Sequence, residues 1–305
     1  MKNNLIYSKR NRRDITDKIA GRMMLIPAVI ISFLLFAIFT LLIIHSEQIL
    51  SLYSLTDLIF SSSWKPLAGD FGFYPFIMGT VCVTSLAMLF SIPISIFSAV
   101  YLSEYAHPKL RRIVQPFIDL LAGIPSVVFG LFGVLLIVPF IRDYLAPLAG
   151  VTSSGYSVLA GAFVLSIMVF PILISITYEV LRTVPVEMRE ASLTLGANQW
   201  ETIKKVVLRK AYPGIIAAII LGFSRAFGET MAVLMVVGNV AKVPSSVFDP
   251  AYPIPALIAN NYGEMMSVPI YDSALMFAAL ILFVMVVFFN IISKYVLIKI
   301  KRRVA

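Results

Sequence analysis

The sequence has few of the residues on which metal centres, disulfides and ATPases depend. Of its 305 residues one is cysteine, Cys82, and two are histidine, His45 and His107, so an intrachain disulfide is excluded. No H-E-x-x-H, C-x-x-C or G-x-S-x-G pattern occurs, which argues against a zinc or serine protease. No glycine is followed by lysine, so the phosphate-binding loop of ATPases is absent. We therefore expect no catalytic residue, no metal and no cofactor in this chain.

Charged residues are also scarce, and long apolar runs take their place. Only 13% of the residues are charged, 59% are hydrophobic and the mean hydropathy is +0.92, which indicates an integral membrane protein. Six runs can cross about 30 Å of hydrocarbon: Met23 to Ile44, Tyr74 to Tyr101, Phe117 to Ile141, Tyr156 to Leu181, Gly214 to Val237 and Asp272 to Ile298. The sequence therefore predicts an all-α fold of six transmembrane helices, kinked or interrupted at Pro125, Pro139 and Pro171.

Lysine and arginine predict how these helices are oriented. Seven lie in residues 1–22, three in residues 102–116, six in residues 182–213 and five from Lys294 onward, whereas the other loops hold three. By the positive-inside rule, both termini and the two basic loops are cytoplasmic. The net charge of +9 then reflects topology and anionic lipid, and no nucleic-acid partner is expected.

The chain divides into four parts, none of them a soluble domain of useful size. We expect a cytoplasmic tail in residues 1–22, a first transmembrane anchor in residues 23–45, a transmembrane domain in residues 74–298 and a second cytoplasmic tail in residues 299–305. The first run could be a cleaved signal sequence. It is longer than the core of such a signal, about 7–15 residues, and no small-x-small cleavage site follows it, so we interpret it as an uncleaved anchor.

The basic loop 182–213 has the sequence features of two short helices. Pro185 suits a first turn, and Gly196 suits a left-handed position at a helix end. Asn198 followed by Glu201 resembles a capping box that opens a second helix. On that helix the apolar residues recur three to four apart and predict one side that packs on protein: Trp200, Ile203, Val207 and Ala211. The alternative is an amphipathic helix that lies on lipid headgroups.

Two opposite charges lie in the fifth apolar run. Arg225 and Glu229, which Thr230 follows, are four residues apart, so on one continuous helix they project from nearly the same side. Counted from Gly214 at ~1.5 Å per residue, they lie about 17 Å and about 23 Å into a core about 30 Å thick. Charges at that depth favour a functional site, and transporter substrate sites lie near this level. The alternative is a structural ion pair that joins two helices.

Small residues are predicted on the same side of this run as the charges. They are Gly214, Ala218, Gly222 and Ala232. Because small residues let another helix approach closely, we expect the charged side to contact a helix and not lipid.

The charged residues suit one oxyanion better than another. The fork of Arg225 matches an oxyanion in a bidentate way. Glu229 would repel a fully ionised anion but would accept a hydrogen bond from a protonated one. Hydrogen phosphate carries an OH near neutral pH and sulfate does not. The hypothesis is therefore a phosphate pathway lined by Arg225, Glu229 and Thr230.

Two motifs resemble a known family of membrane transport subunits. Residues 190–196, Glu-Ala-Ser-Leu-Thr-Leu-Gly, resemble the EAA loop of permease subunits in ATP-binding-cassette importers. Residues 221–233 are similar to the fifth-span signature of bacterial and archaeal phosphate permeases, and their Gly-Glu-Thr-Met-Ala-Val favours the PstC type over the paired PstA type. The similarity extends from about Asp14 to Lys301. This sequence departs from the pattern at three positions: Ser192 replaces an alanine, Arg209 a proline and Asp119 a glutamate.

The resemblance implies a type I importer permease fold with a cytoplasmic coupling helix in loop 182–213. Docking on an ATPase subunit would then involve Glu190, Ala191, Ser192 and Gly196. It also implies partners: a second permease of the PstA type, two ATPase subunits of the PstB type that bind ATP and Mg, and an extracytoplasmic phosphate-binding protein of the PstS type. The chain would form half of the phosphate pathway across the inner membrane of a prokaryote.

Several alternatives remain open. Within the same class, the substrate could be sulfate, molybdate or phosphonate, or the chain could be the PstA-type subunit. A channel or ion-coupled carrier would need no docking loop. A membrane enzyme would need a catalytic constellation, which the sequence does not contain.

Overall fold

Six long apolar helices dominate the structure, a computed structural model that describes residues 2–263 and 268–304. Within these residues the helices that are long and apolar enough to cross a membrane are Ala20–His45, Tyr74–Tyr105, Ser126–Leu148, Val158–Arg182, Gln199–Phe227 and Pro269–Lys299. The predicted all-α fold of six transmembrane helices is confirmed.

Shorter elements connect and extend these helices. The first half of the chain contains α1 (Lys2–His45), α2 (Glu47–Leu52), α3 (Leu55–Phe60), β1 (Trp64–Lys65), η1 (Pro66–Ala68), β2 (Asp70–Phe71), α4 (Tyr74–Val100), the π-helical η2 (Tyr101–Tyr105), α5 (Pro108–Gly123), α6 (Ser126–Phe132), η3 (Gly133–Ile137), α7 (Val138–Phe140), η4 (Ile141–Leu145) and α8 (Ala146–Leu148). The second half contains α9 (Val158–Arg182), α10 (Val186–Thr194), α11 (Gln199–Thr202), the π-helical η5 (Ile203–Val207), α12 (Leu208–Phe227), α13 (Met231–Val236), α14 (Ile254–Asn261) and α15 (Pro269–Val304).

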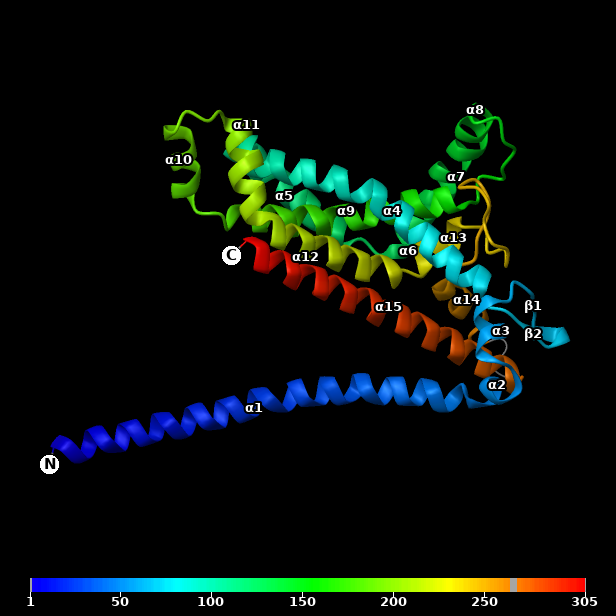
Figure 1. The fold of residues 1–305 in the computed structure, drawn as a ribbon, viewed down its shortest axis with the longest axis horizontal. Coiled ribbons are helices and arrows are strands. Elements are labelled where there is room, and N and C mark those ends of the chain that lie inside the picture. Colours follow the sequence, from blue (N-terminus) through cyan, green and yellow to red (C-terminus); the bar gives the residue numbers. More distant parts are fainter. Residues whose placement is uncertain (1, 264–267, 305) are drawn as a thin grey trace.

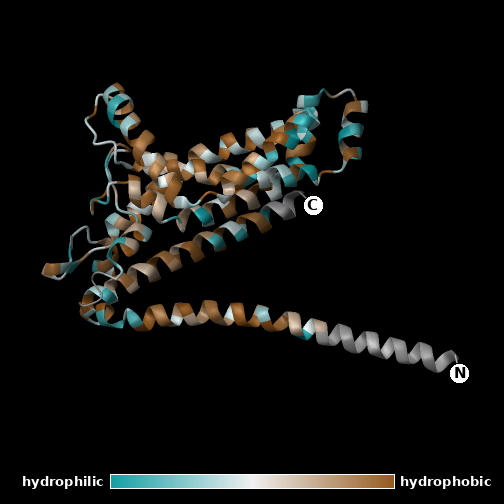
Figure 2. Cartoon of the chain, turned by 180° about the vertical axis from the view of Figure 1, so that it is seen from behind, coloured by the Kyte–Doolittle hydropathy of each residue, from teal (hydrophilic) through white to brown (hydrophobic). Residues whose placement is uncertain are grey.

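The body of the molecule is built on α4, α9 and α12, which lie side by side (Figure 1). Polar segments gather at its two ends, and apolar helices lie between them (Figure 2). One end, here called the hairpin end, holds α10 and α11, and the opposite loop end holds β1, β2 and α14. The free ends of α1 and α15 point to the side of the hairpin end (Figure 1).

The helix α1 is continuous across the predicted boundary between tail and anchor. It runs from Lys2 to His45 without a break and diverges from α15 toward its beginning (Figure 1). In contrast, α4 and α9 approach closely through small residues: the hydroxyl of Ser91 donates to the carbonyl of Ser166 at 3.3 Å. Small side chains thus bring two central helices together.

An aromatic cluster holds the loop end together. The strands β1 and β2 pair antiparallel, with Trp64 opposite Phe71. The Trp64 ring lies 4.8 Å from Phe76, 5.3 Å from Phe73 and 6.1 Å from Tyr271, measured between ring centroids, and each pair meets edge to face. Such pairs are favourable beyond the area they bury. The cluster therefore ties residues 61–73 to α4 and α15.

The third predicted run is interrupted at one of its prolines. The helix α5 ends at Gly123 and α6 begins at Ser126, so the chain leaves the helix at Ile124 and Pro125. Proline restricts the residue before it to extended backbone, which explains a break immediately ahead of Pro125. The other two prolines lie within helical segments that continue past them.

The fifth predicted run is not one helix, and the assumption of a continuous helix from Gly214 to Val237 is wrong. A helical segment that begins at Gln199 continues through η5 and α12 and ends at Phe227, and α13 begins only at Met231. The predicted second cytoplasmic helix and the fifth span are therefore continuous. The break falls instead at residues 228–230, which include two of the predicted site residues.

Candidate functional site

The candidate site lies at the break between α12 and α13. The helix α12 ends at Phe227, and the N–H of Gly228 donates to the carbonyl of Arg225 at 3.1 Å. Glycine is the poorest helix former after proline, so a helix end at Gly228 follows from its backbone freedom. Glu229 and Thr230 follow as half-buried residues outside the helices.

Glu229 caps the short helix that follows it. Its Oε1 accepts hydrogen bonds from the backbone N–H groups of Thr230, at 3.2 Å, and Ala232, at 3.4 Å. The first N–H groups of a helix have no partner within the helix, and they carry the positive end of its dipole. A carboxylate at this position accepts hydrogen bonds from the N–H groups and places a negative charge at the positive end of the dipole.

Arg225 lies in the last turn of α12 and is exposed. A cation is favoured there because the helix dipole is negative at this end. The alternative of a structural ion pair between Arg225 and Glu229 is not found among the described residues. Within residues 2–263 and 268–304, the ion pairs are Arg142–Asp143, Arg189–Glu104 and Lys205–Glu201. The physical reason is the break: a four-residue spacing brings side chains together only on a continuous helix.

A second polar group lies beside Arg225 and was missed by the sequence analysis. The hydroxyl of Ser224 bonds the Oδ1 of Asn290 at 2.9 Å and the carbonyl of Ile220 at 3.1 Å. The Asn290 Nδ2 donates to Val286 within α15. This contact fixes α12 against α15 next to Arg225. The sequence did contain a signal for this contact. Asn290 is an amide in an otherwise apolar run, and polar side chains at membrane depth are rare without a role.

The two interrupted spans meet close to the candidate site. The helices α6 and α13 pack together, and a Cβ built on Gly130 would lie 3.2 Å from the Cα of Ala232 and 2.6 Å from the Sδ of Met235. Only glycine permits this approach. The break after α5 and the break after α12 are therefore joined through α6 and α13.

The predicted helix-contact stripe is confirmed for its members on α12, but Ala232 lies on α13, so the four small residues do not share one helix face. A Cβ on Gly214 would lie 2.3 Å from a methyl carbon of Val180, and one on Gly222 would lie 2.9 Å from a methyl carbon of Leu173. Val180 and Leu173 belong to α9. The small residues thus seat α12 on α9, while Arg225 remains at the exposed edge of this interface.

The hairpin end confirms the predicted helical pair in detail. Gly196 has φ +87°, the N–H of Ala197 donates to the carbonyl of Ser192 at 3.2 Å, and that of Gly196 donates to Leu193 at 3.0 Å. These two bonds form a Schellman motif at the end of α10. Asn198 and Glu201 form the predicted capping box, at 2.8 Å and 3.2 Å.

Three of the four predicted docking residues face outward. Glu190, Ala191 and Gly196 are exposed, whereas Ser192 is half-buried and its hydroxyl bonds that of Thr202 at 2.9 Å. This bond explains what a serine can do where the family pattern has alanine: it ties α10 to α11.

The apolar side of the second cytoplasmic helix packs within the chain. Ile203, Val207 and Ala211 are buried in one cluster with the ends of α4 and α9, and Trp200 is 51% exposed. Three of the four predicted positions are therefore covered by protein. The lipid-surface alternative is not supported for them.

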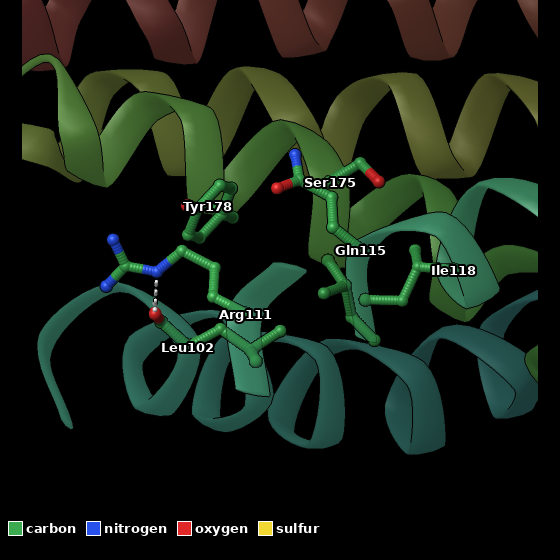
Figure 3. Close-up of a pocket in the computed structure, with 7 residues that line it drawn as sticks. Leu102, Arg111, Gln115, Ile118, Ser175 and Tyr178 are labelled. Atoms are coloured by element: carbon green, nitrogen blue, oxygen red, sulfur yellow. Dashed lines mark hydrogen bonds between the residues drawn. The ribbon is translucent and has the colours of Figure 1, made fainter. Parts of the chain in front are cut away.

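A small cavity between α5 and α9 contains another arginine (Figure 3). Arg111 donates through Nε to the carbonyl of Leu102 at 3.0 Å, and its guanidinium carbon lies 5.7 Å from the ring centroid of Tyr178. The cavity, about 10 Å³, has room for one water molecule at most. The cavity is a small gap between packed helices and is too small for an anion.

Together, the six apolar helices, the two broken spans and the capped hairpin at one polar end define a membrane transport subunit. Residues 91–302 match the sequence profile of the family described as "Binding-protein-dependent transport system inner membrane component", and the chain belongs to that family. It is therefore a permease subunit and not an ATPase, as the sequence predicts.

Known relatives agree with this assignment, and a solved structure shares the fold. The chain is 35% identical over 296 residues to the "Probable ABC transporter permease protein YqgH" of Bacillus subtilis, covering 95% of this chain and 94% of the relative. It is 36% identical over 258 residues to the "Phosphate transport system permease protein PstC" of Xylella fastidiosa, covering 80% and 79%. Its fold resembles a bacterial alginate ABC transporter solved in complex with a periplasmic protein, with a TM-score of 0.57, 16% identity and coverage of 93% and 95%.

Proposed function

We propose that this chain forms half of the pathway for inorganic phosphate across the cytoplasmic membrane, as a permease subunit of an ATP-driven importer. The observation that carries the proposal is Arg225, an exposed guanidinium beside a helix break with no carboxylate partner among the described residues. A guanidinium in an apolar region requires a counter-charge, and an oxyanion matches its fork in a bidentate way. An anion in transit would supply that charge.

Glu229 would add the preference for phosphate over sulfate. Its Oε1 is engaged by backbone N–H groups, whereas its Oε2 accepts no hydrogen bond from the described residues. A free carboxylate oxygen can accept a hydrogen bond from the OH of hydrogen phosphate but finds no donor on sulfate. Thr230, whose hydroxyl lies 3.3 Å from the carbonyl of Gly228, belongs to the same proposed pathway.

The hairpin end would face the cytoplasm and dock on an ATPase. Glu190, Ala191 and Gly196 are exposed on it, and Ser192 fixes α10 to α11. The importer would contain a second permease of the PstA type, two ATPase subunits of the PstB type that bind ATP and Mg, and a phosphate-binding protein of the PstS type. Both termini and the hairpin end would lie in the cytoplasm, since residues 1–22, 182–213 and 294–305 hold eighteen of the 25 lysines and arginines, seven, six and five respectively.

Other oxyanions remain the nearest alternatives. Sulfate and molybdate would use Arg225 in the same way but would gain nothing from Glu229. The name of the Xylella fastidiosa relative supports phosphate, and it supports the PstC type over the PstA type.

Reconstitution with the partner subunits tests the proposal. We expect ATP-dependent uptake of phosphate over sulfate, and Arg225→Lys should lower phosphate uptake at least about tenfold, because lysine keeps the charge but loses the fork. Arg142→Lys is the matched control, since Arg142 lies in an exposed pair with Asp143 outside the candidate site. Unchanged phosphate uptake in Arg225→Lys would refute bidentate recognition, and uptake of sulfate alone would refute the proposed substrate.

A further inference from the structure

An ion pair that is largely shielded from solvent joins the hairpin to the body of the molecule. Arg189, in α10, donates through Nη2 to Oε1 of Glu104 at 3.0 Å and through Nε to Oε2 at 3.2 Å. Glu104 lies in η2, the π-helical continuation of α4. The two side chains are only 18% and 9% exposed. This bidentate, charge-assisted geometry is the most directional that an arginine can form with a carboxylate.

The same guanidinium also bonds the end of α9. Its Nη2 donates to the carbonyl of Leu181 at 2.9 Å, and its Nη1 donates to the carbonyls of Val184 and Pro185. The last carbonyls of a helix have no partner within the helix, so a cation here satisfies them and the helix dipole together. Arg189 therefore connects α10, the end of α9 and the extension of α4.

Glu104 is held from both helices of the hairpin. Its backbone carbonyl accepts from Nε2 of Gln199, in α11, at 3.0 Å. Its Oε1 also accepts from the hydroxyl of Ser103 at 2.9 Å. Glu104 is thus held by Ser103 and Gln199 as well as by Arg189.

Apolar packing does not hold α10. Every residue of α10 is described and none is buried, and its large apolar side chains face outward, with Val186 at 59% and Leu193 at 48% exposure. Its position relative to the body therefore depends on polar contacts: Arg189 to the body, and Ser192 to α11. A displacement of α10 by a docked partner would act on the body through the Arg189 contacts.

We propose that Glu104 and Arg189 are positioning residues that transmit movement of the docking helix to α4 and α9. The ion pair of Glu104 and Arg189 is here called the joint. The body connects the joint to the candidate site, because α9 packs on α4 and on the small residues of α12, and α12 carries Arg225. The inference rests on the proposed importer function, since it assigns to the pair the step between ATPase docking and opening of the pathway. The test therefore measures the coupling between ATP hydrolysis and transport directly.

The experiment uses the complete importer reconstituted in vesicles and measures phosphate taken up per ATP hydrolysed. The variants are Arg189→Lys, which keeps the charge but loses the fork, Glu104→Gln, and both together. We expect each single variant to retain the ATPase subunits but to transport at least about fivefold less phosphate per ATP. The double variant should transport as much phosphate per ATP as the more impaired single variant, because the effects of substituting residues that act as one unit do not add.

The control variant is Lys205→Gln, which removes the exposed pair with Glu201 in the same hairpin, where the side chains are 71% and 41% exposed. It should leave the transport ratio within about twofold of the wild type, since exposed pairs contribute little. Ratios within the same range for Arg189→Lys and Glu104→Gln would overturn the inference. Loss of the ATPase subunits in both single variants and in the double variant would also overturn the inference, because the ion pair would then serve assembly alone. A wild-type complex that hydrolyses ATP but takes up no phosphate would refute the proposed substrate and not the joint.

Discussion

The carboxylate of Glu229 accepts a hydrogen bond from the backbone N–H of Ala232 at 3.4 Å. Through this bond and the one from Thr230, the side chain defines where α13 begins. Because the described residues use only one carboxylate oxygen, the same residue can hold the helix start and present its second oxygen to the proposed pathway. Substitutions of Glu229 can therefore separate its capping of α13 from its proposed recognition of phosphate.

We predict that Glu229→Gln keeps the cap and loses the selectivity. Glutamine retains one carbonyl oxygen for the N–H groups but places an NH₂ donor where the free oxygen lies. Phosphate uptake should fall, and the preference over sulfate should fall about tenfold or more, since one hydrogen bond to a charged group is worth ~1.5–3 kcal/mol. Competing uptake of labelled phosphate and sulfate measures both effects.

Glu229→Ala separates the two roles, because it also removes the cap. It should lower the stability of the complex by roughly 1 kcal/mol in addition to the selectivity loss. If Glu229→Gln leaves both phosphate uptake and sulfate rejection unchanged, Glu229 is a cap and has no recognition role.

Local features of this chain were predictable from sequence, and contacts between distant segments were not. The capping box of Asn198 and Glu201 and the left-handed Gly196 depend on neighbours within five residues, so their pattern alone is sufficient. The expectation that Arg225 and Glu229 project from the same side of one helix failed because helical periodicity was extended across Gly228. The bond between Arg189 and Glu104 spans 85 residues, and no local pattern encodes it.

The close packing of α12 against α9 leads to a prediction about stability. A Cβ on Gly214 would lie 2.3 Å from one methyl carbon of Val180 and 2.9 Å from the other. Valine is stiff at χ1, so it cannot turn away and α12 must move. Gly214→Ala should destabilise the purified complex by about 1–3 kcal/mol, measured by thermal unfolding in detergent.

Gly123→Ala is the matched control for that variant. No atom of the described residues lies within 4 Å of the Cβ that it would add, so we expect a change within about 0.5 kcal/mol. Equal unfolding temperatures for the Gly214 and Gly123 variants would show that the contact between α12 and α9 adjusts without cost.

The loop after α13 should respond to pH. The Oδ2 of Asp249 accepts from the hydroxyl of Ser245 at 2.8 Å and from the N–H groups of Ser245 and Ser246 at 3.0 Å each. These bonds, the hydroxyl of Ser245 first, lower the pKa of Asp249. The stabilisation is complete above the pKa of the unfolded chain, about 3.9, and is lost as pH falls through the lower folded value.

Asp249→Asn should therefore make this loop more sensitive to limited proteolysis at pH 7, with the difference from the wild type vanishing at a pH below the folded pKa. Ser245→Ala should move the acid transition upward, because it removes the largest cause of the pKa shift. A pH-independent difference between Asp249→Asn and the wild type would mean that the effect is not carried by the charge.

The end of the docking helix provides a backbone test of ATPase coupling. Gly196 has φ +87°, and no atom of the described residues lies within 4 Å of an added Cβ. Any cost of substitution thus comes from the left-handed backbone and not from a clash, and it should amount to about 1–2 kcal/mol for a residue with a Cβ. Val should be worse than Ala, and Asn should be tolerated best, because asparagine adopts this conformation most readily.

We expect retention of the ATPase subunits on purification to fall in the order Gly, Asn, Ala, Val at position 196, since a frayed end of α10 displaces the exposed residues Glu190 and Ala191. Gly21→Ala is the control: it also adds a Cβ in open space, but at a residue without positive φ. Wild-type retention in Gly196→Val would show that docking does not require the Schellman end of α10. In that case the docking surface would have to be sought on α11, where Trp200 is half exposed.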